Sequence, residues 1–234
     1  MKIFKIIIDS LFPQKCISCG KIIGSDDFIC EYCLELLEVV DLFKICSSCG
    51  LPKKDCQCKS RVFHYAGVFA PFENTGTAKA AMYRFKFAKV TNGATFFAFE
   101  MAKAVSTVYN DITFDGIAYV PMHFIKEIKR GFNQSKLLAE KLSNILGLKL
   151  YDNLLTSNYR RTSQHDLPTS ERFKNVKGMY KTNYKVTGKT ILLVDDIKTT
   201  GATLDECAKQ LLLAGADNVY CVCGLIRKSK KGKK

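Results

Sequence analysis

The residues with the clearest chemical potential are two adjacent carboxylates, Asp195 and Asp196. They follow an apolar run at residues 190–194 that predicts a buried strand. Ligands bind at the carboxyl ends of the strands in open α/β sheets, where these acids would lie. Residues 198–203 then supply three threonines and Gly201 before a predicted helix, and such a segment can surround a phosphate with hydroxyl and N–H groups. The pattern predicts a sugar-phosphate site, with the acids on vicinal ribose hydroxyls either directly or through Mg²⁺.

A plainer interpretation of this segment is a turn followed by a helix cap, which needs only one Asp or Thr. Two acids followed by Thr-Thr-Gly-x-Thr exceed that need. Residues 194–203 resemble the phosphoribosyl pyrophosphate (PRPP) signature of type I phosphoribosyltransferases. The resemblance implies that Asp195 and Asp196 bind the ribose hydroxyls. It implies that the 5′-phosphate is held by Lys198, Thr199, Thr200, Gly201, Ala202 and Thr203.

Eight of the 11 cysteines lie within residues 16–58, in four close pairs. Pairs at this spacing let two thiolates reach one tetrahedral Zn²⁺, and all-cysteine sites are closed and structural. Sequential pairing into two sites is the simplest arrangement, although the spacing leaves interleaved pairing and an iron–sulfur cluster open. The fourth pair is one residue shorter than the others. The two predicted Zn²⁺ sites consist of Cys16, Cys19, Cys30 and Cys33, and of Cys46, Cys49, Cys56 and Cys58.

Cationic residues lie in two segments between the cysteines and the acidic pair. The first follows a predicted strand at 117–120 and includes Arg-Gly-Phe-Asn-Gln at 130–134. The second spans 160–175 and also contains Pro168. Either segment alone is typical of a solvated loop, but either could also meet a pyrophosphate. Lys86, in an earlier predicted helix, could also contact a pyrophosphate. The candidates for contacts with a pyrophosphate are Lys86, Lys126, Arg130, Arg161, Gln164 and Arg172.

Together these motifs resemble the ComF family of competence proteins. That family places a zinc-ribbon module before a phosphoribosyltransferase-like domain, and the resemblance covers residues 16–226. Two positions depart from the family pattern: Phe87 stands where a Tyr usually follows Lys86, and Lys198 stands where the PRPP motif often has an apolar residue. The other matching residues are Val120, Pro121, residues 130–134, Arg160, Arg161, Gln164, Leu167, Arg172 and Asn175.

The resemblance implies a protein that binds PRPP with Mg²⁺ and handles single-stranded DNA in natural competence. A competence helicase or another DNA-processing protein would then be a partner. Two alternatives remain open: an active phosphoribosyltransferase of nucleotide salvage, and a PRPP- or nucleotide-sensing module whose zinc ribbons contact a partner. The sequence indicates no single catalytic residue, because phosphoribosyl transfer needs mainly positioning of the substrates and electrostatic stabilisation of pyrophosphate.

The net charge of +14 is distributed unevenly along the chain. Residues 1–60 hold eight basic and eight acidic residues, so the remaining 28 basic and 14 acidic residues carry the whole excess. Six of the basic residues lie in the last eight positions, 227–234. Such an excess suits a polyanionic ligand, and equally a solvated surface.

No apolar run is long enough to cross a bilayer, and residues 1–12 predict a short amphipathic helix rather than a signal peptide. We therefore expect a cytoplasmic protein, in which clustered cysteines bind metal more often than they form disulfides. The three histidines predict packing or surface roles rather than metal ligation.

Strands and helices are expected to alternate after the cysteines. This order predicts an α/β fold of the type I phosphoribosyltransferase kind, with a mostly parallel sheet between helices and a small N-terminal zinc-ribbon module. The expected domains are a double zinc ribbon at 1–60, a phosphoribosyltransferase-like domain at 61–227 and a basic tail at 228–234. The predicted strands are 62–72, 117–120, 148–155, 190–194 and 219–226. The predicted helices are 77–88, 91–109, 133–146 and 202–214, with a further short helix in the loop 157–177.

Overall fold

A computed structural model describes residues 13–56, 58, 61–88, 91–158 and 169–227. Three predictions lie outside these residues: the N-terminal helix at 1–12, the tail at 228–234 and the part of the second cationic segment that holds Arg161 and Gln164. Within the described residues, no helix is both long and apolar enough to cross a lipid bilayer.

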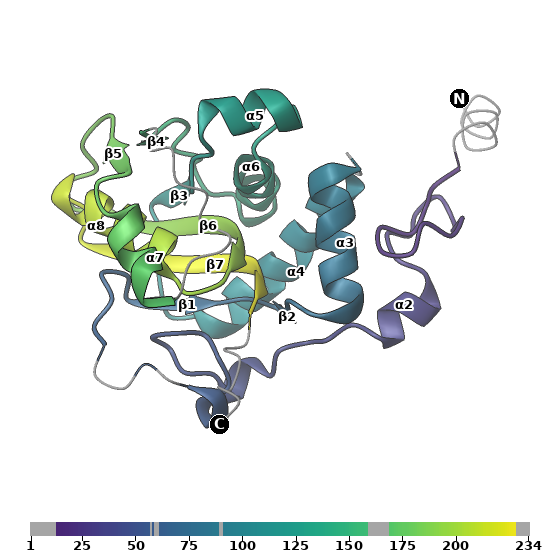
Figure 1. Ribbon diagram of the computed structural model, residues 1–234. Helices are drawn as coiled ribbons and strands as arrows, with labels where there is room; N and C mark the ends of the chain where they lie inside the picture. The colour runs from purple at the N-terminus through teal and green to yellow at the C-terminus, as the bar shows by residue number, and fades with distance from the viewer. Residues whose placement is uncertain (1–12, 57, 59–60, 89–90, 159–168, 228–234) are drawn as a thin grey trace.

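A parallel sheet forms the centre of the molecule, with the strand order β1-β7-β6-β3 and β2 pairing farther along β7 (Figure 1). Its two long central strands have buried apolar stretches, as parallel strands between helices must have, and β6 becomes polar only at its first residue and towards its carboxyl end. The strands are β1 (Gly67–Phe69), β2 (Phe72–Glu73), β3 (Gly116–Tyr119), β6 (Thr190–Lys198) and β7 (Asn218–Ile226).

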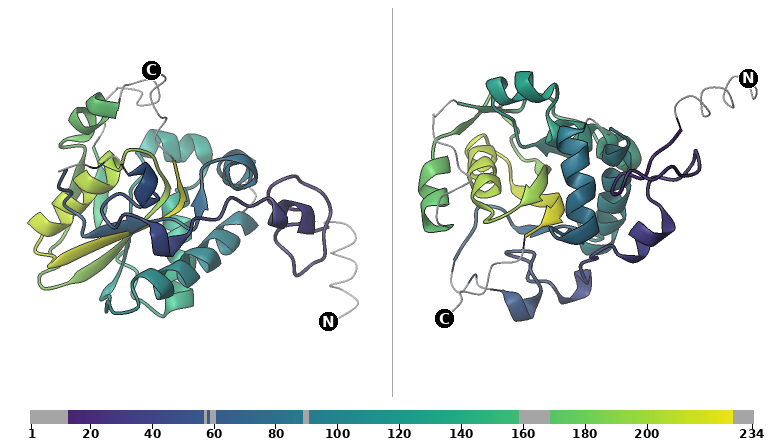
Figure 2. Two further views of the ribbon diagram at one scale, coloured as in Figure 1. Left: turned by 90° about the horizontal axis from the view of Figure 1, so that it is seen from below. Right: turned by 45° about the vertical axis from the view of Figure 1, so that its right-hand side comes forward.

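Helices cover both faces of this sheet (Figures 1 and 2). On one face α4 packs on β7 while α6 packs on β6 and β3, with α3 against α4; α8 covers the other face together with α7. The helices are α3 (Gly76–Phe87), α4 (Asn92–Val108), α5 (Phe124–Arg130), α6 (Gln134–Leu146), α7 (Thr169–Val176) and α8 (Ala202–Leu213). The predicted α/β fold is therefore confirmed.

Local sequence accounts for the ends of α6. The side-chain oxygen of Asn133 accepts hydrogen bonds from the backbone N–H groups of Ser135 and Lys136, at 3.0 and 3.4 Å. Gly147 ends the helix at φ +65°, a conformation that an L side chain rarely adopts. The predicted helix at 133–146 is confirmed, with its first residue serving as the cap.

A small antiparallel hairpin lies outside the main sheet, formed by β4 (Leu155–Ser157) and β5 (Tyr180–Thr182). The strand predicted at 148–155 is wrong in its bounds. Only Leu150 bridges to Ile117 of the sheet, and the chain then turns away at Asn153, whose φ is +54°. A left-handed residue cannot continue a strand, so β4 starts after it.

Two other predictions needed correction. The strand predicted at 62–72 begins only at Gly67 and divides before Phe72. Helix α5 occupies residues that were expected to be a loop: the imidazole of His123 accepts from the Ile125 N–H at 3.2 Å, and Gly131 ends the helix at φ +92°. Seven residues are too few to give a clear helical period, which is why the pattern missed this helix.

The cysteine-rich segment consists of two ribbons. It contains α2 (Glu31–Glu35) and two 3₁₀ turns, η1 (Leu42–Lys44) and η2 (Lys53–Asp55). The first ribbon lies beside α3 at the edge of the molecule (Figures 1 and 2). There the Ser18 hydroxyl donates to the Thr77 carbonyl at 3.1 Å, and the Asn92 amide donates to the Gln14 side chain at 3.0 Å.

Candidate functional site

The carboxyl end of β6 leads into α8 through a short loop. Asp195 and Asp196 lie near the carboxyl end of the strand. Gly201 immediately precedes the helix, at φ +84°. The Thr200 hydroxyl accepts from the Ala202 N–H at 3.3 Å, but the N-cap residue of the helix is Gly201, which has no side chain to cap it. The loop also borders a cleft, which leaves room for a ligand. The cleft is lined by Asp195, Ile197, Lys198, Thr199, Gly201, Ala202, Thr203 and Leu204.

Gly201 has neighbours that exclude any larger residue. A Cβ on Gly201 would lie 2.9 Å from the Tyr65 hydroxyl oxygen and 3.3 Å from Cε of Lys198. Tyr65 and Lys198 are each only 3% exposed, and the Tyr65 hydroxyl has no hydrogen-bond partner among the described residues. A buried polar group of this kind indicates a place where a further acceptor belongs.

Lys198 is buried rather than extended into solvent. Burial lowers the pKa of its ammonium group, and the sulfurs of Cys223, Cys49, Cys58 and Cys221 have a smaller opposing effect. In the sheet Lys198 lies opposite Ile226 of β7, and the side chain of Ile226 also borders Gly50 of the second cysteine group. Cε of Lys198 would lie 3.3 Å from a Cβ on Gly201, so the stem of the side chain lies beside this glycine.

Asp195 is held by two hydrogen bonds to the same oxygen. The Ser135 hydroxyl donates to its Oδ1 at 2.8 Å, and the backbone N–H of Asp196 donates at 2.9 Å. Burial raises the pKa of Asp195 to about 7, and the neighbouring Asp196 carboxylate adds to the effect. A carboxylate kept in an enclosed site beside a second acid is a common feature of ligand sites.

This raised pKa makes a prediction about stability. The unfolded chain ionises Asp195 near pH 4, whereas the folded protein retains the proton until about pH 7. The wild-type protein therefore loses stability relative to Asp195→Asn as the pH rises between these values, by about 2 kcal/mol from pH 5 to pH 7. Denaturant unfolding of both proteins without ligand measures the difference. A constant difference across this range would contradict the prediction.

Asp196 pairs with a residue from a distant helix. Nζ of Lys86, in α3, lies 2.7 Å from its Oδ2, and both side chains are 15% exposed. The sequence placed Lys86 among the candidates for phosphate or pyrophosphate contacts. The structure brings it to the acidic pair, where its ammonium reduces the repulsion between the two carboxylates.

The other cationic candidates are more dispersed. Lys126 and Arg130 lie on α5, where no contact joins them to residues 195–203 within the described part of the chain. Arg130 donates from Nη1 to the Gln134 side chain at 2.7 Å. Arg172 belongs to α7, and its side chain, like the whole of Arg161 and Gln164, is outside the described residues.

The eight N-terminal cysteines gather into two groups in sequence order, which removes the interleaved alternative. In each group four Sγ atoms lie within 4.8 Å of one another, a donor set that fits a closed tetrathiolate Zn²⁺ site. The groups are Cys16, Cys19, Cys30 and Cys33, and Cys46, Cys49, Cys56 and Cys58. The shorter spacing of the last pair does not prevent the second group from forming.

The two ribbons repeat one knuckle turn. In the first, the Gly20 N–H donates to the Cys16 carbonyl at 3.0 Å, and in the second, the Gly50 N–H donates to the Cys46 carbonyl at 2.7 Å. Both glycines have positive φ, +81° and +70°. The glycine that follows each of these pairs is thus explained by the backbone conformation that the turn requires.

The second ribbon is built into the core. A Cβ on Gly50 would lie 2.6 Å from the Val68 carbonyl oxygen of β1 and 2.9 Å from the Ile226 side chain of β7. The Val68 N–H donates to the Ser47 carbonyl at 3.0 Å, and Leu51 is buried against the same cluster of apolar residues. Loss of this ribbon would therefore expose part of the sheet.

Comparison with protein families agrees with this architecture. A model described as "Phosphoribosyl transferase domain" matches residues 90–234, which is more than half of the chain. The chain belongs to this phosphoribosyltransferase family. A second model, "Double zinc ribbon domain", matches residues 7–63, ahead of the phosphoribosyltransferase domain.

Proteins similar to this chain are named for DNA utilisation or for competence. "DNA utilization protein YhgH" of Escherichia coli (strain K12) is 36% identical over 47% of this chain and 49% of its own length. "Competence protein F" of Haemophilus influenzae is 30% identical over 48% of this chain and 50% of its own length, so the chain spans about half the length of these relatives. "Competence protein ComFC" of Bacillus subtilis is 27% identical over 92% of this chain and 90% of its own length. The predicted resemblance to ComF proteins is confirmed.

Solved phosphoribosyltransferases are more distant. A purine phosphoribosyltransferase from Pyrococcus horikoshii is 19% identical, covering 56% of this chain and 71% of its own, with a TM-score of 0.35. An adenine phosphoribosyltransferase is 15% identical, covering 63% of this chain and 75% of its own, with a TM-score of 0.38. Scores this low carry no further argument, and the fold assignment rests on the sheet and the family match.

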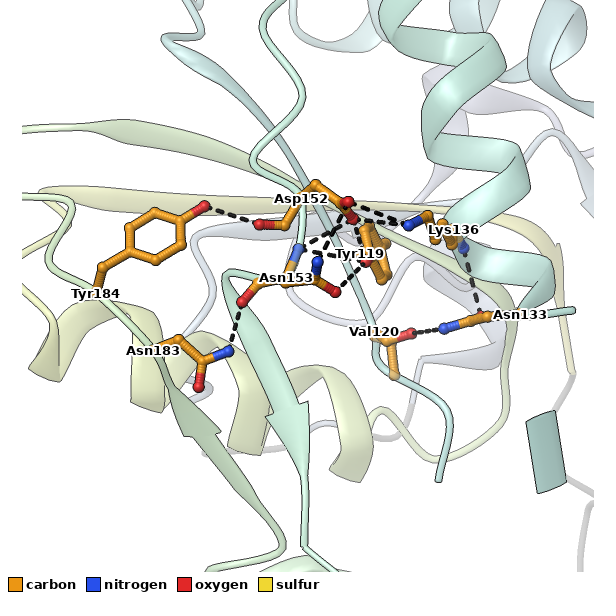
Figure 3. A network of polar contacts seen from close by, with 8 residues as sticks. All are labelled: Tyr119, Val120, Asn133, Lys136, Asp152, Asn153, Asn183 and Tyr184. Atoms are coloured by element: carbon orange, nitrogen blue, oxygen red, sulfur yellow. Dashed lines mark hydrogen bonds and ion pairs between the residues drawn. The ribbon is translucent and has the colours of Figure 1, made fainter. Parts of the chain in front are cut away.

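In the phosphoribosyltransferase domain, a polar network ties the β4–β5 hairpin to the sheet (Figure 3). The Tyr119 hydroxyl at the end of β3 donates to Asp152 at 2.6 Å, and Lys136 of α6 forms an ion pair with the same carboxylate at 3.0 Å. After β5, the Asn183 amide donates to the Asn153 carbonyl at 2.6 Å. The network fixes both ends of the hairpin, and the second cationic segment connects its strands.

Two residues near the loop were not identified from the sequence. Ser135 follows the Arg-Gly-Phe-Asn-Gln motif directly, and its position at a helix start was the one signal that could have indicated a ligand-side role. Tyr65 lies in an apolar segment that gave no sign of contact with the loop at Gly201. Ser135 contacts Asp195, and Tyr65 lies beside Gly201, so each meets a residue that is distant in the sequence.

Proposed function

We propose that this protein binds Mg-PRPP at residues 195–203 and handles single-stranded DNA in competence or DNA utilisation. The observation that carries the PRPP proposal is the joint placement of Asp195 and Asp196 at the end of β6, directly before a glycine-opened helix start. Acids on one side and backbone N–H groups on the other match a ribose 5-phosphate.

Different residues of the loop would bind different parts of the ligand. Asp195 and Asp196 would accept hydrogen bonds from the two ribose hydroxyls, or hold Mg²⁺ together with them. Lys198, Thr199, Thr200, Gly201, Ala202 and Thr203 would surround the 5′-phosphate through backbone N–H and hydroxyl groups. Lys86 would remain beside Asp196 or move to the pyrophosphate, for which Lys126, Arg130, Arg161, Gln164 and Arg172 are further candidates.

The DNA proposal is supported by charge and by the relatives. The basic excess lies outside residues 1–60, in the part of the chain that includes the phosphoribosyltransferase domain. The relatives are named for competence and DNA utilisation. The two ribbons would hold structural Zn²⁺ and offer a surface to a DNA-processing protein such as a helicase, in the cytoplasm.

Affinity for single-stranded DNA should fall steeply with salt. If six phosphates are neutralised by Lys and Arg, the slope of log K against log salt concentration is about −4. Fluorescence anisotropy with a labelled oligothymidylate between 50 and 300 mM salt measures this. Absent binding, or binding indifferent to salt, would refute the DNA part of the proposal and leave the PRPP part standing.

A second candidate function is phosphoribosyl transfer to a base in nucleotide salvage, which the family match favours. Incubation with Mg-PRPP and a panel of purine and pyrimidine bases tests it through release of pyrophosphate. Base-dependent release would establish turnover. Binding of PRPP without release would favour a DNA-handling or sensing role.

A further inference from the structure

The outer face of α3 carries two aromatic side chains that contact each other in solvent. Tyr83 and Phe87 lie one helical turn apart, are 63% and 56% exposed, and have ring centroids 4.7 Å apart. A single exposed aromatic residue is ordinary on a soluble protein. Two in contact form a continuous apolar surface that can accept a planar ligand.

Arg130 completes this surface from the neighbouring helix. The centre of its guanidinium group lies 4.9 Å from the centroid of the Phe87 ring. The hydrogen bond to Gln134, which is fully buried, holds the guanidinium in that position. Phe132, in the connection that follows α5, packs on Phe85 of α3 with centroids 5.6 Å apart, which fixes the two helices side by side.

The two helices that form this surface carry mostly positive charge. Helix α3 contains three basic residues and no acidic one. Helix α5 contains Lys126, Lys129 and Arg130 against the single acid Glu127. Exposed aromatic rings among cations suit bases that are joined by phosphates, because every base has a face to stack and every linkage has a charge to neutralise.

The surface lies next to the acidic pair. Lys86, which reaches Asp196, directly precedes Phe87, and consecutive helical residues point about 100° apart. One side of α3 therefore faces the Asp195–Asp196 pair while the adjoining side presents the aromatic pair.

We propose that Tyr83, Phe87 and Arg130 form a stacking site for the bases of single-stranded nucleic acid, beside the ion pair of Lys86 and Asp196. This rests on the proposed function only in requiring that the protein binds single-stranded DNA. It adds the location and the mode of contact. Stacking makes the site tolerant of sequence, as handling of unspecified DNA requires.

The chain contains no tryptophan, so one tryptophan can report stacking directly. In Phe87→Trp, binding of an unlabelled oligothymidylate should strongly quench the tryptophan emission, because a stacked base contacts the indole face. Phe99→Trp is the matched control. Phe99 in α4 is 51% exposed and also has a cation over its ring, Lys103 at 4.4 Å, but that lysine is paired with Glu100. Its emission should not change.

Alanine variants measure the contribution to affinity. Tyr83→Ala/Phe87→Ala should weaken oligothymidylate binding by about 5- to 100-fold, the range expected for loss of one stacked base. Its salt slope should match the wild-type slope because no charge is removed. Arg130→Met should weaken binding and also reduce the slope by about 0.7. Phe99→Ala should change neither quantity.

The outcomes separate this proposal from the broader one. If the wild-type protein does not bind the oligonucleotide, both the DNA role and the stacking site are refuted. If it binds and the alanine variants bind equally well, or Phe87→Trp is not quenched, the stacking site alone is refuted. A changed oligomeric state of Tyr83→Ala/Phe87→Ala in sedimentation, with unchanged DNA affinity, would identify an interface between copies and also refute it.

Discussion

Replacing Asp195 and Asp196 together with asparagine lowers the affinity for Mg-PRPP by about 100-fold or more. Each carboxylate is expected to accept a hydrogen bond from a ribose hydroxyl or to hold Mg²⁺, and a hydrogen bond to a charged group contributes about 1.5–3 kcal/mol. Two such losses exceed the 2.8 kcal/mol that corresponds to 100-fold. Calorimetric titration of the variant with Mg-PRPP measures the effect.

Two controls separate ligand binding from folding. Asp217→Asn removes an exposed acid just before β7, away from the loop, and should bind Mg-PRPP like the wild type. The second control adds Lys86→Met to the double variant, because Asp196→Asn leaves Lys86 without the partner 2.7 Å away. Stability should recover in this triple variant while binding stays weak. Recovery of binding would show that the unpaired Lys86, and not the loss of the carboxylates, weakens binding in the double variant.

Replacing Cys49 with serine has the largest expected effect on stability. Cys49 is buried, and its neighbours Gly50 and Leu51 pack against the sheet. Loss of the second Zn²⁺ site should reduce the bound zinc from two ions to one and destabilise the whole protein by about 4 kcal/mol, or roughly 10 °C in melting temperature. Because Lys198 lies opposite Ile226, which borders Gly50 of this ribbon, affinity for Mg-PRPP should fall as well.

Cys19→Ser is the matched control in the first ribbon. Cys19 is exposed, and its ribbon hydrogen-bonds to α3 and α4 through Ser18 and Gln14, with the buried Ile17 as its apolar contribution to the core. This variant should also lose one zinc ion, but its melting temperature should fall by less than about 4 °C. PRPP affinity should be unchanged. Equal effects of the two substitutions would contradict the unequal roles assigned to the ribbons.

The parts of the site that the sequence predicted are those encoded locally. The apolar run 190–194, the two acids and the glycine before α8 are contiguous, so their order alone indicates a strand, a loop and a helix start. Helix α6 could likewise be predicted, because Asn133 and Gly147 supply both of its ends. The spacing of the cysteines favoured sequential grouping as the simplest arrangement, and their positions in the structure select it over interleaved pairing.

The parts that could not be predicted depend on contacts between distant segments. Lys86 and Asp196 are 110 positions apart, and only the packing of α3 beside the sheet brings them together. The burial of Lys198, which is 3% exposed, also depends on tertiary packing. Neither contact has a signature in local spacing.

Calorimetric titration of the zinc-loaded protein with PRPP, with and without Mg²⁺, tests the central claim most directly. We expect saturable binding of one PRPP per chain that requires Mg²⁺ and is lost in Asp195→Asn/Asp196→Asn. Absence of binding by the wild type, or equal binding by that variant, would contradict the assignment of residues 195–203 as the PRPP site.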